Sequence, residues 1–204
     1  MTRRPLVLAS ASPSRLRILR DAGFDPIVRV SAVDEDRYAA TNPQDIVREL
    51  ACRKARAVAE ASDLPPAAIV VGCDSLFQID GVMYGKPGDP ATARQRWHMM
   101  RGKTGTLLTG HCIIDCATHA EVSATAQTQV TFGMPTEGEI DSYVASGEPI
   151  HVAGAFTLEG RASLFIERIE GDPSNVIGLS VPTFRALLTE VGIAAIDLWR
   201  DPSV

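Results

Sequence analysis

Asp74 and Lys86 are an acid and a base at positions where a folded chain normally has neither. Asp74 follows the apolar run 67–71, which predicts a strand buried on both faces. Aspartate is rare in strands and is seldom buried without a partner, so this position indicates a cation, a metal or a cleft. Asp80-Gly81 is a hairpin signal that returns the chain toward Asp74 and ends at Lys86. We therefore expect both side chains at one site, although a strand-edge acid and a solvated lysine would explain each residue alone.

A second candidate is the turn from Ser10 to Arg15, where a phosphate could bind. The run 6–9 predicts a first buried strand, and Ser12 with Pro13 predicts the cap and first residue of a helix. Free backbone amides and the helix dipole favour an anion at such a turn. Capping explains Ser12 without a ligand, but it explains Ser10 and Arg15 less well.

Three consecutive acids at positions 34–36 follow a second predicted strand, 26–31. Most acidic triplets are solvated loops. Together with Asp74, however, one of these acids could hold a divalent metal, because hard cations take carboxylate oxygens. Lys54 lies at the margin of the apolar stripe of a helix predicted from Pro43 to about position 62. A lysine there usually extends to solvent, but it could also reach into a cleft.

The rest of the chain alternates predicted strands and helices, which indicates an α/β fold with a mixed sheet. A capping box at Thr136 begins a helix, and the small residues of 153–160 would let the backbone approach a ligand closely. The other elements predicted are a helix at 90–102, an antiparallel pair of strands at 106–116 and 122–132, a strand at 164–169 and a helix at 182–191.

Composition is that of an ordinary globular protein: 45% of the 204 residues are apolar and 22% are charged. This length suits one domain or two lobes that share a sheet. The formal net charge of −5 disfavours non-specific binding to nucleic acid or membranes, so an anionic ligand must meet a local basic pocket. No apolar run has the length of a signal or membrane-spanning segment, and we expect a cytoplasmic protein.

The four cysteines lack the paired two-residue spacing of a zinc site, and the four histidines show no ligand spacing. Buried free thiols are the ordinary explanation for such cysteines. In a reducing cytoplasm we expect no disulfide.

Seven short blocks, in order along nearly the whole chain, resemble the Maf family of nucleoside triphosphate pyrophosphatases. Each block is weak alone, but seven in register are a strong signal. The blocks are LASASPSR at 8–15, VDE at 33–35, RKA at 53–55, GCDS at 72–75, GKP at 85–87, AGAF at 153–156 and VIGL at 176–179.

The resemblance implies that a nucleoside triphosphate is hydrolysed between its α and β phosphates, with a divalent metal, Mg²⁺ or Mn²⁺. It also implies one Maf-like domain over residues 1–204, with a mixed twisted sheet in two lobes around a central cleft, like the inosine triphosphatase type. A homodimer is a further expectation of the family.

By position, Asp74 matches the family's proposed proton acceptor. The matching polar residues of its active site are Ser10, Arg15, Glu35, Lys54 and Lys86, and Ser12 lies within the same phosphate-binding block. Glu35 and Asp74 are the candidate metal ligands, although the sequence does not separate a base from a ligand at Asp74. Three positions that tune substrate choice correspond to Ser14, Ser75 and Glu159. Ser14 departs from the Arg or Trp of many relatives, and Ser180 departs from their Pro.

Two other functions compete with this one. The family has been associated with septum formation, so the chain could be a nucleotide-binding regulator of cell division with little turnover; intact Asp74, Glu35, Lys54 and Lys86 argue against that. A dinucleotide-binding oxidoreductase fits poorly, because the first strand-to-helix turn lacks the G-x-G-x-x-G glycines.

Overall fold

The structure is a computed structural model that describes residues 3–35 and 39–200. Its contacts divide the chain into two compact units. Unit 1 comprises 1–74, 109–126 and 178–204, and unit 2 comprises 75–108 and 127–177. Three long strands, β3 (Ile69–Ile79), β5 (Thr104–Asp115) and β6 (Ala120–Phe132), contribute residues to both units.

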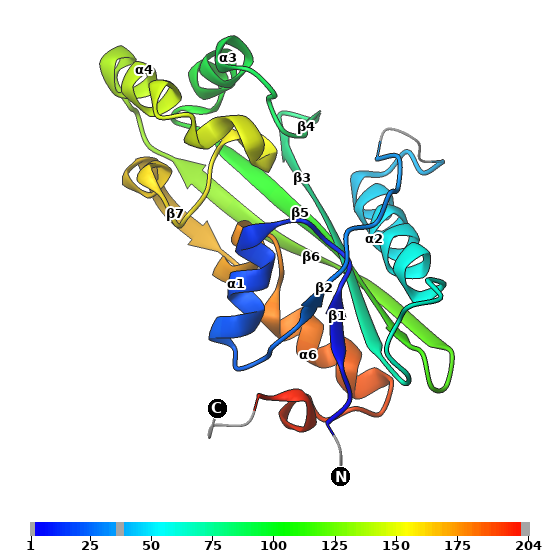
Figure 1. Ribbon diagram of the computed structural model, residues 1–204. Helices are drawn as coiled ribbons and strands as arrows, with labels where there is room; N and C mark the ends of the chain where they lie inside the picture. The colour runs from blue at the N-terminus through cyan, green and yellow to red at the C-terminus, as the bar shows by residue number, and fades with distance from the viewer. Residues whose placement is uncertain (1–2, 36–38, 201–204) are drawn as a thin grey trace. The chain divides into compact units, whose positions relative to one another are not determined.

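Seven strands form one sheet in the order β2-β1-β3-β5-β6-β7, with β4 paired to β3 (Figure 1). Strand β1 (Leu6–Leu8) is parallel to β2 (Ile27–Val28) and to β3. Strand β4 (Val82–Tyr84) is antiparallel to β3, and β7 (Ile166–Glu170) is antiparallel to β6. The predicted α/β fold with a mixed sheet is therefore confirmed.

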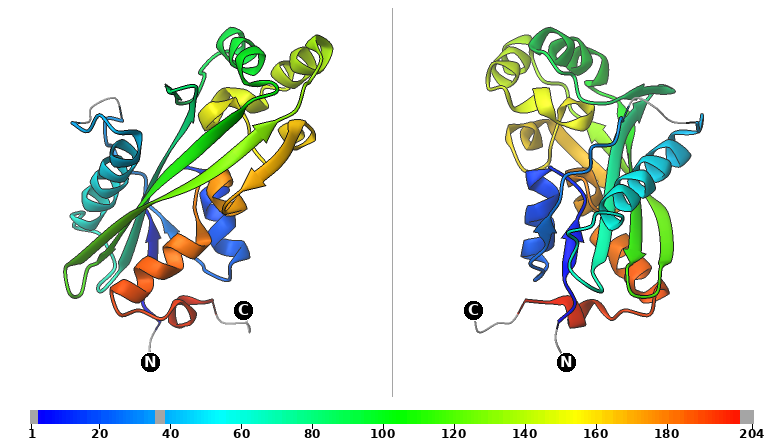
Figure 2. Two further views of the ribbon diagram at one scale, coloured as in Figure 1. Left: turned by 180° about the vertical axis from the view of Figure 1, so that it is seen from behind. Right: turned by 45° about the vertical axis from the view of Figure 1, so that its right-hand side comes forward.

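Three capped helices belong to unit 1: α1 (Pro13–Asp21), α2 (Pro43–Ala59) and α6 (Val181–Glu190). Ser12, Asn42 and Ser180 cap them through their side chains, and a proline occupies the first turn of each. Helix α2 lies on one side of the strands of unit 1, and α1 and α6 lie on the other (Figure 2). None of the helices among residues 3–35 and 39–200 is long and apolar enough to cross a bilayer.

Two glycines bring α2 unusually close to the sheet of unit 1. A Cβ at Gly72 of β3 would lie 2.3 Å from the carbonyl oxygen of Ala51, and one at Gly110 of β5 would lie 2.1 Å from that of Val47. Any side chain at either position would push the helix away. The absence of side chains at Gly72 and Gly110 therefore allows α2 to lie this close to the strands.

Unit 2 packs around aromatic rings. Its helices are α3 (Pro90–Met100), α4 (Glu137–Ala145) and α5 (Pro173–Ile177), with short 3₁₀ turns at Glu148–His151, Ala153–Ala155 and Arg161–Phe165. Another 3₁₀ turn, Ala195–Leu198, belongs to unit 1. The predicted capping box of α4 is present. Asp80 and Gly81 both have positive φ, 50° and 78°, as the predicted tight hairpin between β3 and β4 requires.

Two local predictions needed correction. Asp74 lies inside the eleven-residue strand β3, not after a short one. The second strand is only Ile27–Val28, because its partner among the described strands is β1, which has just three residues. In the small-residue segment, a Cβ at Gly154, whose φ is 71°, would lie 2.8 Å from the Cβ of Phe77, so Gly154 serves the packing of unit 2. Its approach to a ligand stays a prediction.

Candidate active site

Lys54, Asp74 and Glu35 form a compact ion cluster in unit 1. The Nζ atom of Lys54 lies 2.6 Å from Oδ1 of Asp74 and 2.6 Å from Oε1 of Glu35. The side chains of Lys54 and Asp74 are 7% and 13% exposed, whereas that of Glu35 is 51% exposed. One ammonium thus bridges a shielded carboxylate and an exposed one.

The position of Lys54 follows from the packing of α2. Its neighbours Ala51 and Ala55 are fully buried on the side of the helix that packs against Gly72. Lys54 is itself buried and points inward, because the carboxylate of Asp74 compensates the charge that burial would otherwise penalise. Of the two possibilities that the sequence left open for this lysine, the structure selects the inward one.

Arg15 is also buried, and its guanidinium connects three separate segments of unit 1. Nε donates to the carbonyl of Gly178 at 2.8 Å. One terminal nitrogen donates to the carbonyl of Cys73 at 2.9 Å and to Oγ of Ser10 at 3.0 Å. Arg15 therefore holds the β1–α1 turn against the backbone just before Asp74. Its predicted contact with phosphate stays a prediction.

The serines of the β1–α1 turn have distinct local roles. Ser12 caps α1 by accepting from the amide of Arg15 at 3.4 Å. Oγ of Ser10 accepts from the amide of Ser12 at 3.2 Å, so Ser10 shapes the turn as well as contacting Arg15. Ser14 lies half-buried in the first turn of the helix. These hydrogen bonds fix the conformation of the turn, as a phosphate site at a helix N-terminus requires.

The other predicted site residues belong to unit 2. Lys86 is exposed after β4, Ser75 is half-buried in β3, and Glu159 is exposed in a turn. The amide of Glu159 donates to Oγ1 of Thr157 at 3.4 Å. That these three residues share a cleft with Asp74, as two lobes around one site require, stays a prediction. Asp36, the last of the three acids, lies outside the described residues.

Sequence reasoning missed His111 and the role of Ser180. His111 is fully buried; its Nε2 accepts from the amide of Ser180 at 2.8 Å, and its Nδ1 lies 3.0 Å from the carbonyl of Thr109. Nδ1 is then the protonated nitrogen and donates to Thr109. A proline in place of Ser180 has no amide to donate. Ser180 can therefore pair with the histidine through its amide, and no local pattern indicated that pairing.

The residues present fit a divalent cation. Two carboxylate oxygens, from Glu35 and Asp74, converge on one positively charged atom, Nζ of Lys54. Carboxylate oxygens are the ligands that Mg²⁺ and Mn²⁺ prefer. The partial exposure of Glu35 leaves room for water or phosphate oxygens to complete the coordination.

Comparisons with known proteins identify the family to which the chain belongs. The sequence pattern of the family described as Maf-like protein matches residues 5–191. A nucleoside triphosphate pyrophosphatase of Streptomyces avermitilis is 55% identical over 97% of this chain and 95% of its own. Proteins of the same name from Streptomyces coelicolor and Nocardia farcinica are 53% and 50% identical, each over 97% of this chain and over 95% and 98% of their own.

Among solved structures, a nucleoside-triphosphatase described as a dITP/XTP pyrophosphatase from Mycobacterium abscessus is 14% identical, with a TM-score of 0.40 over 78% of this chain and 93% of its own. Kinship with the inosine triphosphatase type therefore rests on the resemblance of the sequence. The family itself is settled by the match along residues 5–191 and by the full-length relatives. The chain belongs to the Maf-like protein family.

Proposed function

We propose that this protein is a nucleoside triphosphate pyrophosphatase that removes unwanted nucleotides from the cellular pool. It cleaves the bond between the α and β phosphates and releases a nucleoside monophosphate and pyrophosphate. The observation that carries the proposal is the Lys54 ammonium held 2.6 Å from both Asp74 and Glu35, in a chain of this family. Such a cluster supplies the base and the positive charge that hydrolysis of a phosphoanhydride needs.

Asp74 is the residue that activates water in this mechanism. Its carboxylate accepts a proton as the water oxygen attacks the α phosphorus and the bond to the β phosphate breaks. Lys54 fixes the orientation of that carboxylate and offers positive charge to the developing negative charge. Arg15 is a positioning residue, since it holds the backbone carbonyl of Cys73 immediately before the base.

Positive charge must be local in a protein with a net charge of −5. Lys54, Arg15 and, from unit 2, Lys86 supply it, with the Ser10–Arg15 turn binding phosphate oxygens. Glu35 and Asp74 would hold a Mg²⁺ or Mn²⁺ ion, which when bound neutralises phosphate charge and lowers the pKa of water. We further propose a cytoplasmic homodimer, as expected for the family.

The test is to incubate purified protein with single nucleoside triphosphates and Mg²⁺ or Mn²⁺ and to follow products over time. Pyrophosphate and monophosphate should appear in equal amounts from the first time point. Early nucleoside diphosphate with orthophosphate would contradict cleavage at the α phosphate. Nucleotide binding without any product would instead favour a binding regulator of cell division.

Glu159 is proposed to select the base. An ionised carboxylate only accepts hydrogen bonds, and the Watson–Crick edge of guanine offers two adjacent donors. Uracil and thymine present a carbonyl on either side of one donor, and these carbonyl oxygens would repel the carboxylate of Glu159. Guanosine-type triphosphates, including methylated ones, should therefore have a higher kcat/KM than UTP or dTTP.

Glu159→Gln tests this selection because glutamine both donates and accepts. The preference should shrink by about tenfold, the scale of one hydrogen bond to a charged group. The control is Glu167→Gln, which removes another exposed carboxylate of unit 2 and should leave the preference unchanged. A wild-type preference for UTP or dTTP would show that Glu159 does not read the base in this way.

A further inference from the structure

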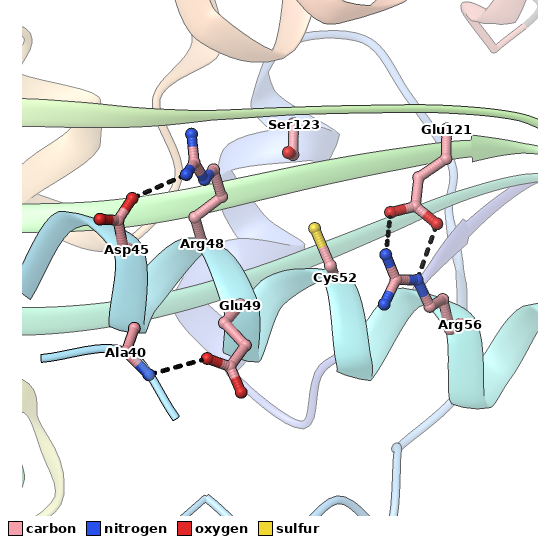
Figure 3. Close-up of a pocket in the computed structure, with 8 residues that line it drawn as sticks. All are labelled: Ala40, Asp45, Arg48, Glu49, Cys52, Arg56, Glu121 and Ser123. Carbon is pink, nitrogen blue, oxygen red and sulfur yellow. Dashed lines mark hydrogen bonds and ion pairs between the residues drawn. The ribbon is translucent and has the colours of Figure 1, made fainter. Parts of the chain in front are cut away.

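A polar cavity of about 290 Å³ opens in unit 1 beside α2 (Figure 3). It is separate from the ion cluster of Lys54: Cys52 lies two residues before Lys54, and side chains two apart on a helix leave it in different directions. In Figure 3 the sulfur of Cys52 points from α2 toward Ser123 and Glu121. The lining residues are Ala40, Asp45, Arg48, Glu49, Cys52, Arg56, Glu121 and Ser123.

A second thiol completes a ligand set at this cavity. Sγ of Cys52 from α2, Sγ of Cys112 from β5 and a carboxylate oxygen of Glu121 from β6 all lie within 4.8 Å of one another. Cys52 is 7% exposed and Cys112 is fully buried. The side chain of Glu121 is 31% exposed, so the cluster is open to solvent on the side of the carboxylate.

We propose that Cys52, Cys112 and Glu121 bind a zinc ion, with water in the fourth position. Two sulfur ligands and one carboxylate suit Zn²⁺, whereas Mg²⁺ and Mn²⁺ prefer oxygen ligands alone. Zinc–sulfur bonds of about 2.3 Å and zinc–oxygen bonds of about 2.1 Å place the ligand atoms of a tetrahedral site about 3.5–3.8 Å apart. The three atoms of this cluster all lie within 4.8 Å of one another, which is compatible with such a site.

Charge balance favours a divalent ion at this cluster. Glu121 accepts from Nε and a terminal nitrogen of Arg56 at 2.8 and 2.6 Å, so without metal the carboxylate and guanidinium cancel. With both thiols ionised, three negative ligands face one Arg56 cation, and a divalent ion restores neutrality. Arg56 also fixes the orientation of Glu121, as the outer partners of metal ligands commonly do.

The two thiols influence each other's pKa. A hydrogen bond from Cys112 lowers the pKa of Cys52 to about 7 against the opposing effect of burial, with a smaller contribution from Ser123. The same contact raises the pKa of Cys112, so in the metal-free protein one thiol keeps its proton and stabilises the other. On binding, two zinc–sulfur bonds form, and any remaining thiol protons pass to solvent.

The ion would connect α2 to the unit 1 parts of β5 and β6, which lie more than 50 residues further along the chain from Cys52. This is a stabilising role, distinct from that of the cation proposed at Glu35 and Asp74. The three ligands are brought together only in the folded chain, so zinc should bind the folded state more tightly than the unfolded one. Zinc should therefore raise the melting temperature.

The test uses the full chain, reduced with a phosphine and stripped of metal, in excess Mg²⁺ so that oxygen-ligand sites are occupied. Zinc is titrated in competition with a chromophoric chelator, and Co²⁺ is added separately as a spectroscopic probe. We expect one zinc per chain, a sulfur-to-cobalt charge-transfer band, and a rise in melting temperature with zinc.

The variants assign the site. Cys52→Ser and Cys112→Ser should lower zinc affinity by about a hundredfold or more and abolish the cobalt band, since each removes a ligand. Glu121→Gln should lower affinity by at least about tenfold, at the lower end of what even outer partners cost. Cys116→Ser, which changes a cysteine outside the cluster, should match the wild type.

Equal zinc affinity in the wild type and Cys52→Ser would overturn the proposal, as would a reduced wild type without the cobalt band. A Cys52–Cys112 disulfide that forms in air while the reduced protein binds no zinc would also overturn it. If Cys112→Ser fails to fold, Glu121→Gln decides, because that residue is partly exposed.

Discussion

The two units bury different kinds of side chain. Among the described residues, every buried charged residue belongs to unit 1: Arg15, Lys54 and Asp115. The core of unit 2 is instead a network of edge-on aromatic rings, in which Phe132 lies 4.9 Å from Phe156, 5.6 Å from Trp97 and 5.8 Å from Phe77 between ring centroids. Among its described residues, unit 1 has one such pair, Phe24 with Phe184.

The buried charges of unit 1 and the aromatic core of unit 2 should contribute differently to activity and stability. Buried charge destabilises a fold unless it is paired, so it is retained where a function requires it. Aromatic burial stabilises directly, and edge-on pairs add about 0.5–1.5 kcal/mol each. We therefore expect substitutions in the ion cluster of unit 1 to change activity more than stability, and substitutions in the core of unit 2 to do the reverse.

The largest expected effect is that of Asp74→Asn. The change is nearly isosteric but removes the charge that accepts a proton, so kcat should fall by about a hundredfold to ten-thousandfold. Circular dichroism should match the wild type, and the loss of stability should be modest, because Glu35 still pairs with the ammonium of Lys54. The control is Asp63→Asn, which removes an exposed carboxylate 3.2 Å from Arg29 in the same unit. Near-full turnover in a folded Asp74→Asn protein would show that the base lies elsewhere.

Phe132→Ala should have the opposite signature. It deletes a fully buried ring that contacts three others, and such changes cost about 3–5 kcal/mol of unfolding free energy. Urea denaturation measures this loss. At a temperature where the variant is still folded, kcat should stay within a few-fold of the wild type. A catalytic loss as large as that of Asp74→Asn would remove the contrast between the units.

Lys54→Met and Lys103→Met compare two ion pairs of equal length. Lys103 lies 2.6 Å from Asp80 in unit 2, but its side chain is 47% exposed, against 7% for Lys54. Exposed pairs contribute about 0–1 kcal/mol, whereas loss of a shielded partner leaves a carboxylate uncompensated at about 1–3 kcal/mol. Lys54→Met should therefore lower both stability and kcat, and Lys103→Met neither. Equal effects of the two changes would mean that burial does not distinguish these pairs.

The smallest expected effect concerns Asp115, a buried carboxylate of unit 1 away from the ion cluster. Hydrogen bonds from Arg4 hold its pKa at about 2, below its usual 3.8. Because the folded pKa is depressed, its stabilisation is present above about pH 4 and is lost as pH falls toward 2. Asp115→Asn should cost about 2 kcal/mol in urea denaturation near pH 7, and the gap should narrow at about pH 3. A gap that does not change with pH would assign the loss to packing.

Much of the architecture could be predicted because its causes are local. Ser12 with Pro13, Asn42 with Pro43, and Thr136 with Glu139 begin helices through hydrogen bonds spanning three or four residues, and all three helices are present. The Asp80-Gly81 turn needs only two residues that tolerate positive φ. Asp74 could be singled out for the same reason, since an acid after an apolar run is visible in the sequence.

The arrangement of the site was decided by tertiary structure. Lys54 meets Asp74 because Gly72 and Gly110 let α2 approach the strands, a contact between segments that no local pattern connects. Arg15 takes its partners from Cys73 and Gly178, the latter 163 residues away.

Cys52 and Cys112 show the same limit most clearly. Their spacing along the chain resembles no metal motif, yet α2 and β5 bring their sulfurs together beside Glu121. Residue types and caps are properties of short segments, so the sequence by itself determined which groups were available and which elements would carry them. Which groups meet depends on strand order and on how closely a helix packs, and only the folded chain determines that.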